Sequence, residues 1–130
     1  MNLDRISWEC VHFVKSGSPE AAEAAVTPKG FQRFEVDGAP VRSGEALLGA
    51  VDATMKFPSY FGGNWDALDE CLRDLDWLPP AAGYVLVVRN AGRLWKQDAL
   101  SAGKFSQAWL GAAEEWAKQG KPFHLVFMDM

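Results

Sequence analysis

The segment 84–88 constrains the fold of this chain more than any other, because it is an almost purely apolar run. Gly83 and Asn90 bound the segment, and a short apolar run rich in β-branched residues is typical of a strand. A strand with apolar side chains at every position must be buried on both faces, as in a parallel sheet covered by helices. The sequence therefore predicts an α/β domain built around this strand.

Two further strands are predicted in the main part of the chain. Residues 31–36 combine aromatic and β-branched types and end at the turn signal formed by Asp37 and Gly38. Residues 122–128 form another short apolar run, which indicates a second buried strand.

Three helices are predicted between these strands. Ser43 is typical of an N-cap, and the apolar residues after it recur at helical spacing until Pro58. Asn64 can cap a second helix that ends near residue 75, before two prolines. A third, amphipathic helix is expected over about 104–118, and Gly120 follows its end.

The order strand, helix, helix, strand, helix, strand predicts one compact α/β domain with a largely parallel sheet and right-handed crossovers. We assign residues 30–130 to this domain, and the total length of 130 residues suits a single core. Residues 1–29 are interpreted as an N-terminal extension with a short strand at 8–14, followed by an alanine-rich run. An added edge strand, a lid on the sheet and a tether all stay open as its role.

Composition narrows the classes of partner. The 17 acidic residues exceed the 13 basic ones, for a net charge of −4, which argues against nucleic acid or an anionic membrane and for a basic partner. No segment has the roughly 18 apolar residues of a membrane helix, and no export signal precedes the first strand. Two distant cysteines, Cys10 and Cys71, do not make a disulfide framework, so we expect a cytoplasmic protein.

The motifs of common enzyme classes are missing from this sequence. It contains no glycine-rich phosphate loop, no paired-histidine zinc motif and no nucleophile elbow. Cys10 and His12 can offer two ligands on one face of a strand, but zinc sites need three or four. We interpret both, with His124 and Cys71, as packing residues, and we predict no catalytic residue, cofactor, metal or small-molecule substrate.

The predicted helix 64–75 carries the most informative pattern. Trp65, Leu68, Cys71, Leu72 and Leu75 form one apolar stripe that should face the core. The charged residues then lie together on the opposite face. They are Asp66, Asp69, Glu70, Arg73 and Asp74, with a summed charge of −4 + 1 = −3.

Two interpretations of this charged face stay open. Any amphipathic helix has charged residues opposite its apolar stripe, and Arg73 can neutralise Asp69 or Glu70. Alternatively, Asp66 and Glu70 repel each other at i, i+4, and a cationic partner would reverse that cost. Tyr60 and two glycines precede the helix, a mixture common in protein interfaces, and we expect one of Tyr60 and Phe61 to be in the core.

Residues 57–72 resemble the signature of the barstar family, intracellular inhibitors of secreted microbial ribonucleases and their relatives. The similarity is specific at Tyr60, at Gly62, at the Asn-x-Asp-Ala-Leu sequence that begins at Asn64, and at the acid-Cys-Leu that begins at Glu70. A weaker similarity extends from about residue 31 to 129 and leaves out the extension. The resemblance implies a small three-stranded parallel sheet packed with helices, to which the extension would add a strand.

The resemblance also implies roles for individual residues. Tyr60, Gly62, Asn64, Trp65 and Asp66 would contact the nuclease, Glu70 would enter its catalytic pocket, and Glu115 would act as an accessory acid. The physical basis is phosphate mimicry, since a carboxylate can meet the cationic donors that a ribonuclease places around phosphate. The chain departs from the family pattern at Gly63, Asp69 and Glu70.

We therefore predict a non-enzymatic inhibitor of a basic ribonuclease or ribonuclease toxin. The second hypothesis is a barstar-like module that binds a different protein through the same surface, and the third is a small enzyme that depends on His12, His124 or a metal. The predicted partner-binding residues are Tyr60, Gly62, Asn64, Trp65, Asp66, Asp69, Glu70, Arg73, Asp74 and Glu115.

Overall fold

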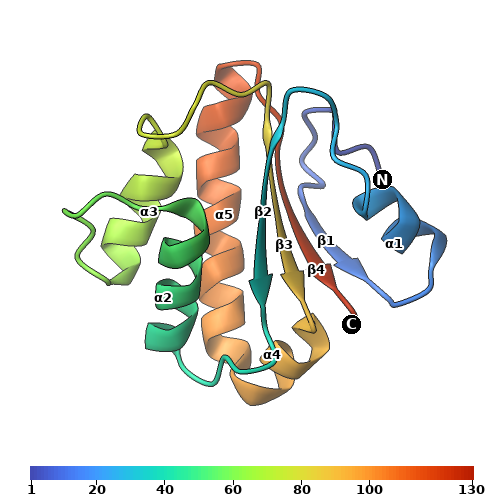
Figure 1. Ribbon diagram of the computed structural model, residues 1–130, viewed down its shortest axis with the longest axis vertical. Coiled ribbons are helices and arrows are strands. Elements are labelled where there is room, and N and C mark those ends of the chain that lie inside the picture. The colour runs from blue at the N-terminus through green and yellow to red at the C-terminus, as the bar shows by residue number, and fades with distance from the viewer.

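A four-stranded parallel sheet forms the centre of the protein in the computed structural model, which describes residues 1–130 (Figure 1). The strand order is β1-β4-β3-β2, and all three neighbouring pairs are parallel. The predicted parallel sheet is thus confirmed, and the strand in the extension joins it at the edge beside β4. The strands are β1 (Val11–Val14), β2 (Gln32–Asp37), β3 (Tyr84–Arg89) and β4 (Phe123–Met128).

Helices cover both faces of this sheet. In Figure 1, α2, α3 and α5 lie on one side of the strands, whereas α1 and the N-terminal segment lie on the other. None of the helices combines the length and the apolar character that a membrane span requires. The helices are α1 (Pro19–Ala24), α2 (Gly44–Met55), α3 (Trp65–Asp74), α4 (Ala91–Gln97) and α5 (Ala99–Lys118).

The uninterrupted apolar run of β3 is explained by two separate cores. Leu86 and Val88 belong to the large core shared with α2, α3 and α5. Val85 and Val87 point to the opposite face and join a smaller core with residues of β1, β4, α1 and the N-terminal segment. Because successive side chains of a strand alternate between faces, each of these positions must be apolar.

The predicted helix starts are confirmed where a side chain caps them. Ser43 Oγ accepts a hydrogen bond from the Ala46 amide at 3.1 Å, and Asn64 Oδ1 accepts one from the Ala67 amide at 2.8 Å. The predicted start of α5 near residue 104 is wrong: the helix begins at Ala99, after an Asp98 cap. The short helices α1 and α4 were not predicted from periodicity, because each spans only one or two turns.

Two histidines fasten the N-terminal segment to the sheet. His124 Nε2 lies 2.8 Å from the backbone oxygen of Arg5, which can only accept, so this nitrogen carries a proton. His124 Nδ1 is then an acceptor for His12 Nε2–H, 2.9 Å away. This arrangement requires a neutral His124 ring. Burial and then the neighbouring His124 lower the pKa of His12 to about 4, and burial lowers the pKa of His124.

The histidine pair should make the protein less stable in mild acid. In the unfolded chain His12 takes up a proton near pH 6.5, whereas in the folded protein it does so only near pH 4. The free energy of unfolding is therefore highest above pH 6.5 and falls as the pH drops from 6.5 toward 4. We expect a loss of about 2 to 3 kcal/mol from His12. Urea unfolding at several pH values measures it. His12→Gln keeps a donor but cannot titrate, and an unchanged pH profile in this variant would contradict the assignment.

Candidate functional site

Helix α3 is held rigidly by its apolar face. Leu68, Cys71 and Leu72 are fully or almost fully buried, and they pack into the large core. In addition, Trp116 of α5 donates its indole N–H to the backbone oxygen of Leu72 at 2.8 Å, within the protein interior. The position of α3 is therefore fixed by packing and by a buried hydrogen bond, and its opposite face stays available to solvent.

The loop before α3 reaches the helix through two exposed glycines. Gly63 has a φ of +70°, a conformation that residues with a Cβ rarely adopt, and Asn64 then caps the helix. Trp65 is half-buried at the first helical position, and the Lys104 ammonium lies 5.8 Å from its ring centroid. The expectation that Trp65 faces the core is thus met in part, since one portion of the ring remains accessible.

Four charged residues of α3 and α5 neutralise one another. Arg73 Nε donates to Asp69 Oδ2 at 3.1 Å, and Arg73 Nη1 lies 3.6 Å from Glu115 Oε1. Lys118 Nζ in turn lies 3.4 Å from the same glutamate oxygen. We call Asp69, Arg73, Glu115 and Lys118 the ion-pair chain. Its charges sum to −1 + 1 − 1 + 1 = 0, so it contributes little net field.

The remaining acids of α3 form a separate group. Asp66, Glu70 and Asp74 are all exposed, and none of them takes part in an ion pair. Because they follow one another at i, i+4 and i+8, they lie along one face of the helix. We call these three residues the acidic row. Its charge of −3 has no ion-pair partner within the molecule.

Tyr60 lies at the C-terminal end of the acidic row. Its side chain is 68% exposed, whereas Phe61 is half-buried against Phe57 of the core at a centroid distance of 4.8 Å, so the expectation that one of the two belongs to the core is met in part. Restricted hydration and then the charge of Asp74 raise the pKa of the Tyr60 hydroxyl. The ring is therefore accessible and adjacent to an acid.

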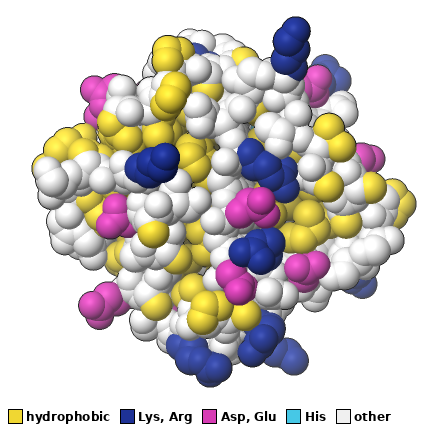
Figure 2. Space-filling model, in the orientation of Figure 1, with side chains coloured by type: hydrophobic (Ala, Val, Ile, Leu, Met, Phe, Trp, Pro, Cys, Tyr) yellow, Lys and Arg dark blue, Asp and Glu magenta, His cyan; other side chains and the backbone are white.

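The structure brings the predicted binding residues onto one surface, formed by the loop before α3, by α3 and by one turn of α5 (Figure 1). Acidic side chains also mark the margin of Figure 2 where α2 and α3 lie. Of the two partners expected for Arg73, the structure selects Asp69, and Glu70 stays without an ion pair. The predicted residues Tyr60, Gly62, Asn64, Asp66, Glu70 and Asp74 are exposed, and Trp65, Asp69, Arg73 and Glu115 are half-buried.

The other chemistry-bearing residues lie elsewhere. Cys10 and Cys71 are free thiols in the interior, and burial raises the pKa of each. His12 and His124 bind each other across β1 and β4. No three of the His, Cys, Asp and Glu side chains are arranged to hold a metal ion.

Sequence reasoning missed two residues that shape this surface. Lys118 completes the ion-pair chain, which was signalled only by its i, i+3 spacing from Glu115. Gly111 of α5 provides the space for Arg73: a Cβ at this position would lie 2.7 Å from Arg73 Nη2. No sequence pattern indicates this contact, because it depends on how α3 packs against α5.

Replacing Gly111 by alanine should displace the Arg73 guanidinium. A glycine in a helix interior costs about 1 kcal/mol relative to alanine, so both Gly111→Ala and the control Gly103→Ala should gain helix stability. Gly103 has open space at its Cβ position, and we expect the full gain there. Gly111→Ala should gain less, because the ion pairs of Arg73 are lost. Thermal unfolding measures the stability gain of each variant. When Arg73→Ala is added to both, the two gains should become equal. Equal gains in the two single variants would contradict the contact between Gly111 and Arg73.

Comparison with known proteins identifies the family of the chain. A search of curated proteins gives no match. A model of the family described as "Barstar (barnase inhibitor)" matches residues 31–128, most of the chain, including the loop before α3, α3 itself and α5. The chain belongs to the barstar family.

Proposed function

We propose that this protein binds a basic ribonuclease and blocks its active site with the acidic row. The family is one of ribonuclease inhibitors rather than enzymes. The observation that carries the proposal is that Asp66, Glu70 and Asp74 are exposed on a rigid helix without an ion-pair partner, whereas the neighbouring charges are paired.

The geometry of the acidic row supports phosphate mimicry. A rise of 1.5 Å per residue separates its first and last members by about 12 Å along the helix axis. A ribonuclease gathers cationic side chains around the phosphate that it cleaves, and carboxylates on a fixed helix can accept charge-assisted hydrogen bonds from them. Because α3 is already packed, little conformational entropy is lost on binding.

The residues around the acidic row receive supporting roles in this proposal. Tyr60, beside Asp74, offers an accessible aromatic ring at one end, and the exposed part of Trp65 offers another. Gly62 and Asn64 shape the backbone that approaches the partner. Asp69, Arg73 and Glu115 hold α3 against α5 and form the rim.

A cytoplasmic location is part of the proposal. Both cysteines are free and buried, as is common in reducing compartments. An inhibitor kept in the cytoplasm would protect the cell's own RNA from a ribonuclease made there before export.

A second candidate partner is a basic protein that is not a ribonuclease. The observation that favours it is Arg73, which is 37% exposed, so that a cationic group, paired with Asp69 and Glu115, lies within the candidate surface. Asp69 is engaged by this arginine and is less available to a partner. A partner surface with one acidic group among its cations would fit this pattern better than a uniformly cationic pocket.

The acidic row is tested by charge-neutral substitutions. Asp66→Asn, Glu70→Gln and Asp74→Asn each remove a charge and preserve shape, and each should weaken binding to a ribonuclease from the same organism by about tenfold or more. Calorimetric titration measures affinity, and cleavage of a fluorescent RNA measures inhibition. The affinity should also fall as salt rises.

Glu114→Gln is the matched control, since Glu114 is an exposed acid of α5 outside the candidate site, beside a cavity lined by Trp8. It should leave affinity unchanged. If the three substitutions abolish binding to a partner that is not a nuclease, the second candidate is correct. If they alter no binding at all, the acidic row is not the interface.

A further inference from the structure

The outer edge of β1 is an unpaired sheet edge. The amide of Leu125 donates to the Cys10 oxygen at 2.8 Å, and the amide of Met130 donates to the Val14 oxygen at 2.9 Å. Even-numbered residues of this segment therefore direct their backbone groups toward β4, and Val11 and Phe13 direct theirs outward. No strand lies on that side, so these amides and carbonyls are open to a further strand.

The two ends of this edge are asymmetric. The Glu9 amide donates to Ser7 Oγ at 3.0 Å, and the Lys15 oxygen accepts from Ser18 Oγ at 2.7 Å. Of the outward backbone groups of Glu9 and Lys15, two therefore have no hydrogen-bond partner, the oxygen of Glu9 and the amide of Lys15.

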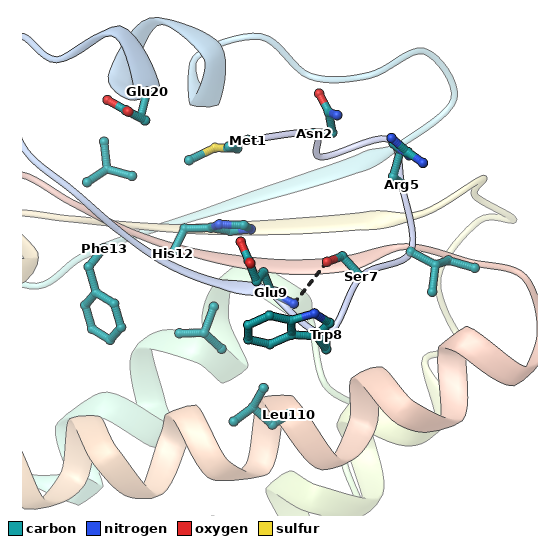
Figure 3. Close-up of a pocket in the computed structure, with 13 residues that line it drawn as sticks. Met1, Asn2, Arg5, Ser7, Trp8, Glu9, His12, Phe13, Glu20 and Leu110 are labelled. Carbon is teal, nitrogen blue, oxygen red and sulfur yellow. Dashed lines mark hydrogen bonds between the residues drawn. The ribbon is translucent and has the colours of Figure 1, made fainter.

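A groove and exposed aromatic side chains accompany the edge. Figure 3 shows β1 between the N-terminal segment on one side and Trp8 and Leu110 on the other. The groove has a volume of about 990 Å³, and Trp8 and Phe13 are 85% and 57% exposed. An accessible edge strand flanked by large apolar side chains favours association with another strand.

The opposite edge of the sheet is protected. Over β2, charged side chains of both signs alternate along the face seen in Figure 2. Glu35 of β2 lies 3.8 Å from Arg33 Nε and 3.6 Å from Arg89 Nε. Charged side chains of this kind discourage pairing at an edge, so the two edges differ in their availability.

We propose that a second copy of this chain pairs with the first through β1, antiparallel and related by a two-fold axis at His12, so that the two sheets form one continuous sheet. Val11 of each copy lies opposite Phe13 of the other, and Glu9 lies opposite Lys15. The proposal is independent of the ribonuclease-binding function, because α3 is not part of this interface.

The backbone groups match this register. Val11 and Phe13 exchange both hydrogen bonds, as outward-directed residues do in antiparallel pairs. At each end, the unpaired Lys15 amide of one copy donates to the unpaired Glu9 oxygen of the other. The Glu9 amide and the Lys15 oxygen have no intermolecular partner in this register, and they are the groups already bound to Ser7 and Ser18. A shift that aligns Val11 with Val11, or Phe13 with Phe13, breaks this correspondence.

The side chains match it as well. Val11 and Phe13 share one face of β1, on which Phe13 stacks on Phe127 at a centroid distance of 5.3 Å. The dimer pairs a β-branched with an aromatic side chain twice, and its register brings the acidic Glu9 of each copy level with the basic Lys15 of the other. It also covers part of the exposed surface of Phe13. The edge is thus complementary to itself in backbone, charge and shape.

The test is the mass of the protein in solution. A sheet-edge contact is small, so we expect a dimer dissociation constant of roughly 10 to 100 μM. In sedimentation equilibrium, the average mass should rise from 14.3 kDa toward twice that value as concentration increases. Glu9→Lys or Lys15→Glu alone places like charges opposite each other at both ends and should weaken the dimer about tenfold. The double variant with both substitutions restores the pairs and should recover affinity to within about threefold.

Val11→Pro tests the backbone. It removes an outward N–H that the β4 ladder does not use, so the chain should fold, as circular dichroism will show, and should stay monomeric. A wild-type protein that is monomeric at about 500 μM would overturn the proposal. A dimer that responds equally to the single and double charge changes would overturn the register. Neither result bears on ribonuclease inhibition, which is measured separately.

Discussion

The removal of β3 from water on both of its faces is the constraint on which the rest of the structure depends. One set of its side chains needs α2, α3 and α5, and the other set needs α1 and the N-terminal segment. Burial of a large aliphatic side chain contributes about 1.5 to 3 kcal/mol, so leaving either face uncovered would remove much of a small domain's stability. The extension residues therefore complete a core.

The same packing determines what α3 presents outward. Leu68, Cys71 and Leu72 orient the helix, and the hydrogen bond from Trp116 to Leu72 fixes its height along α5. Once the helix is oriented, the charged residues divide according to their distance from α5. Asp69 and Arg73, next to α5, pair with each other, and Arg73 also pairs with Glu115 of that helix, whereas the acids farther away have no ion-pair partner. The uncompensated charge thus results from helix packing and not from the local sequence alone.

Local patterns predicted most of the fold and part of the site. The apolar runs indicated β3 and β4, and the caps at Ser43 and Asn64 indicated α2 and α3, because each signal lies within a few residues. The start of α5 was missed, since its first turn has little apolar periodicity. The pairing of Arg73 with Glu115 and the contact of His12 with His124 join distant parts of the chain, and no single-sequence pattern carries that information.

The pairing of β1 with β4 joins the first strand of the chain to the last, Val11 opposite Leu125. During synthesis on the ribosome, β1 precedes its pairing partner and has no place in the sheet until β4 has been made. Contacts between such distant residues close late and slow folding. Docking of β1, with its exposed Phe13, therefore belongs to the last steps by which the sheet is completed.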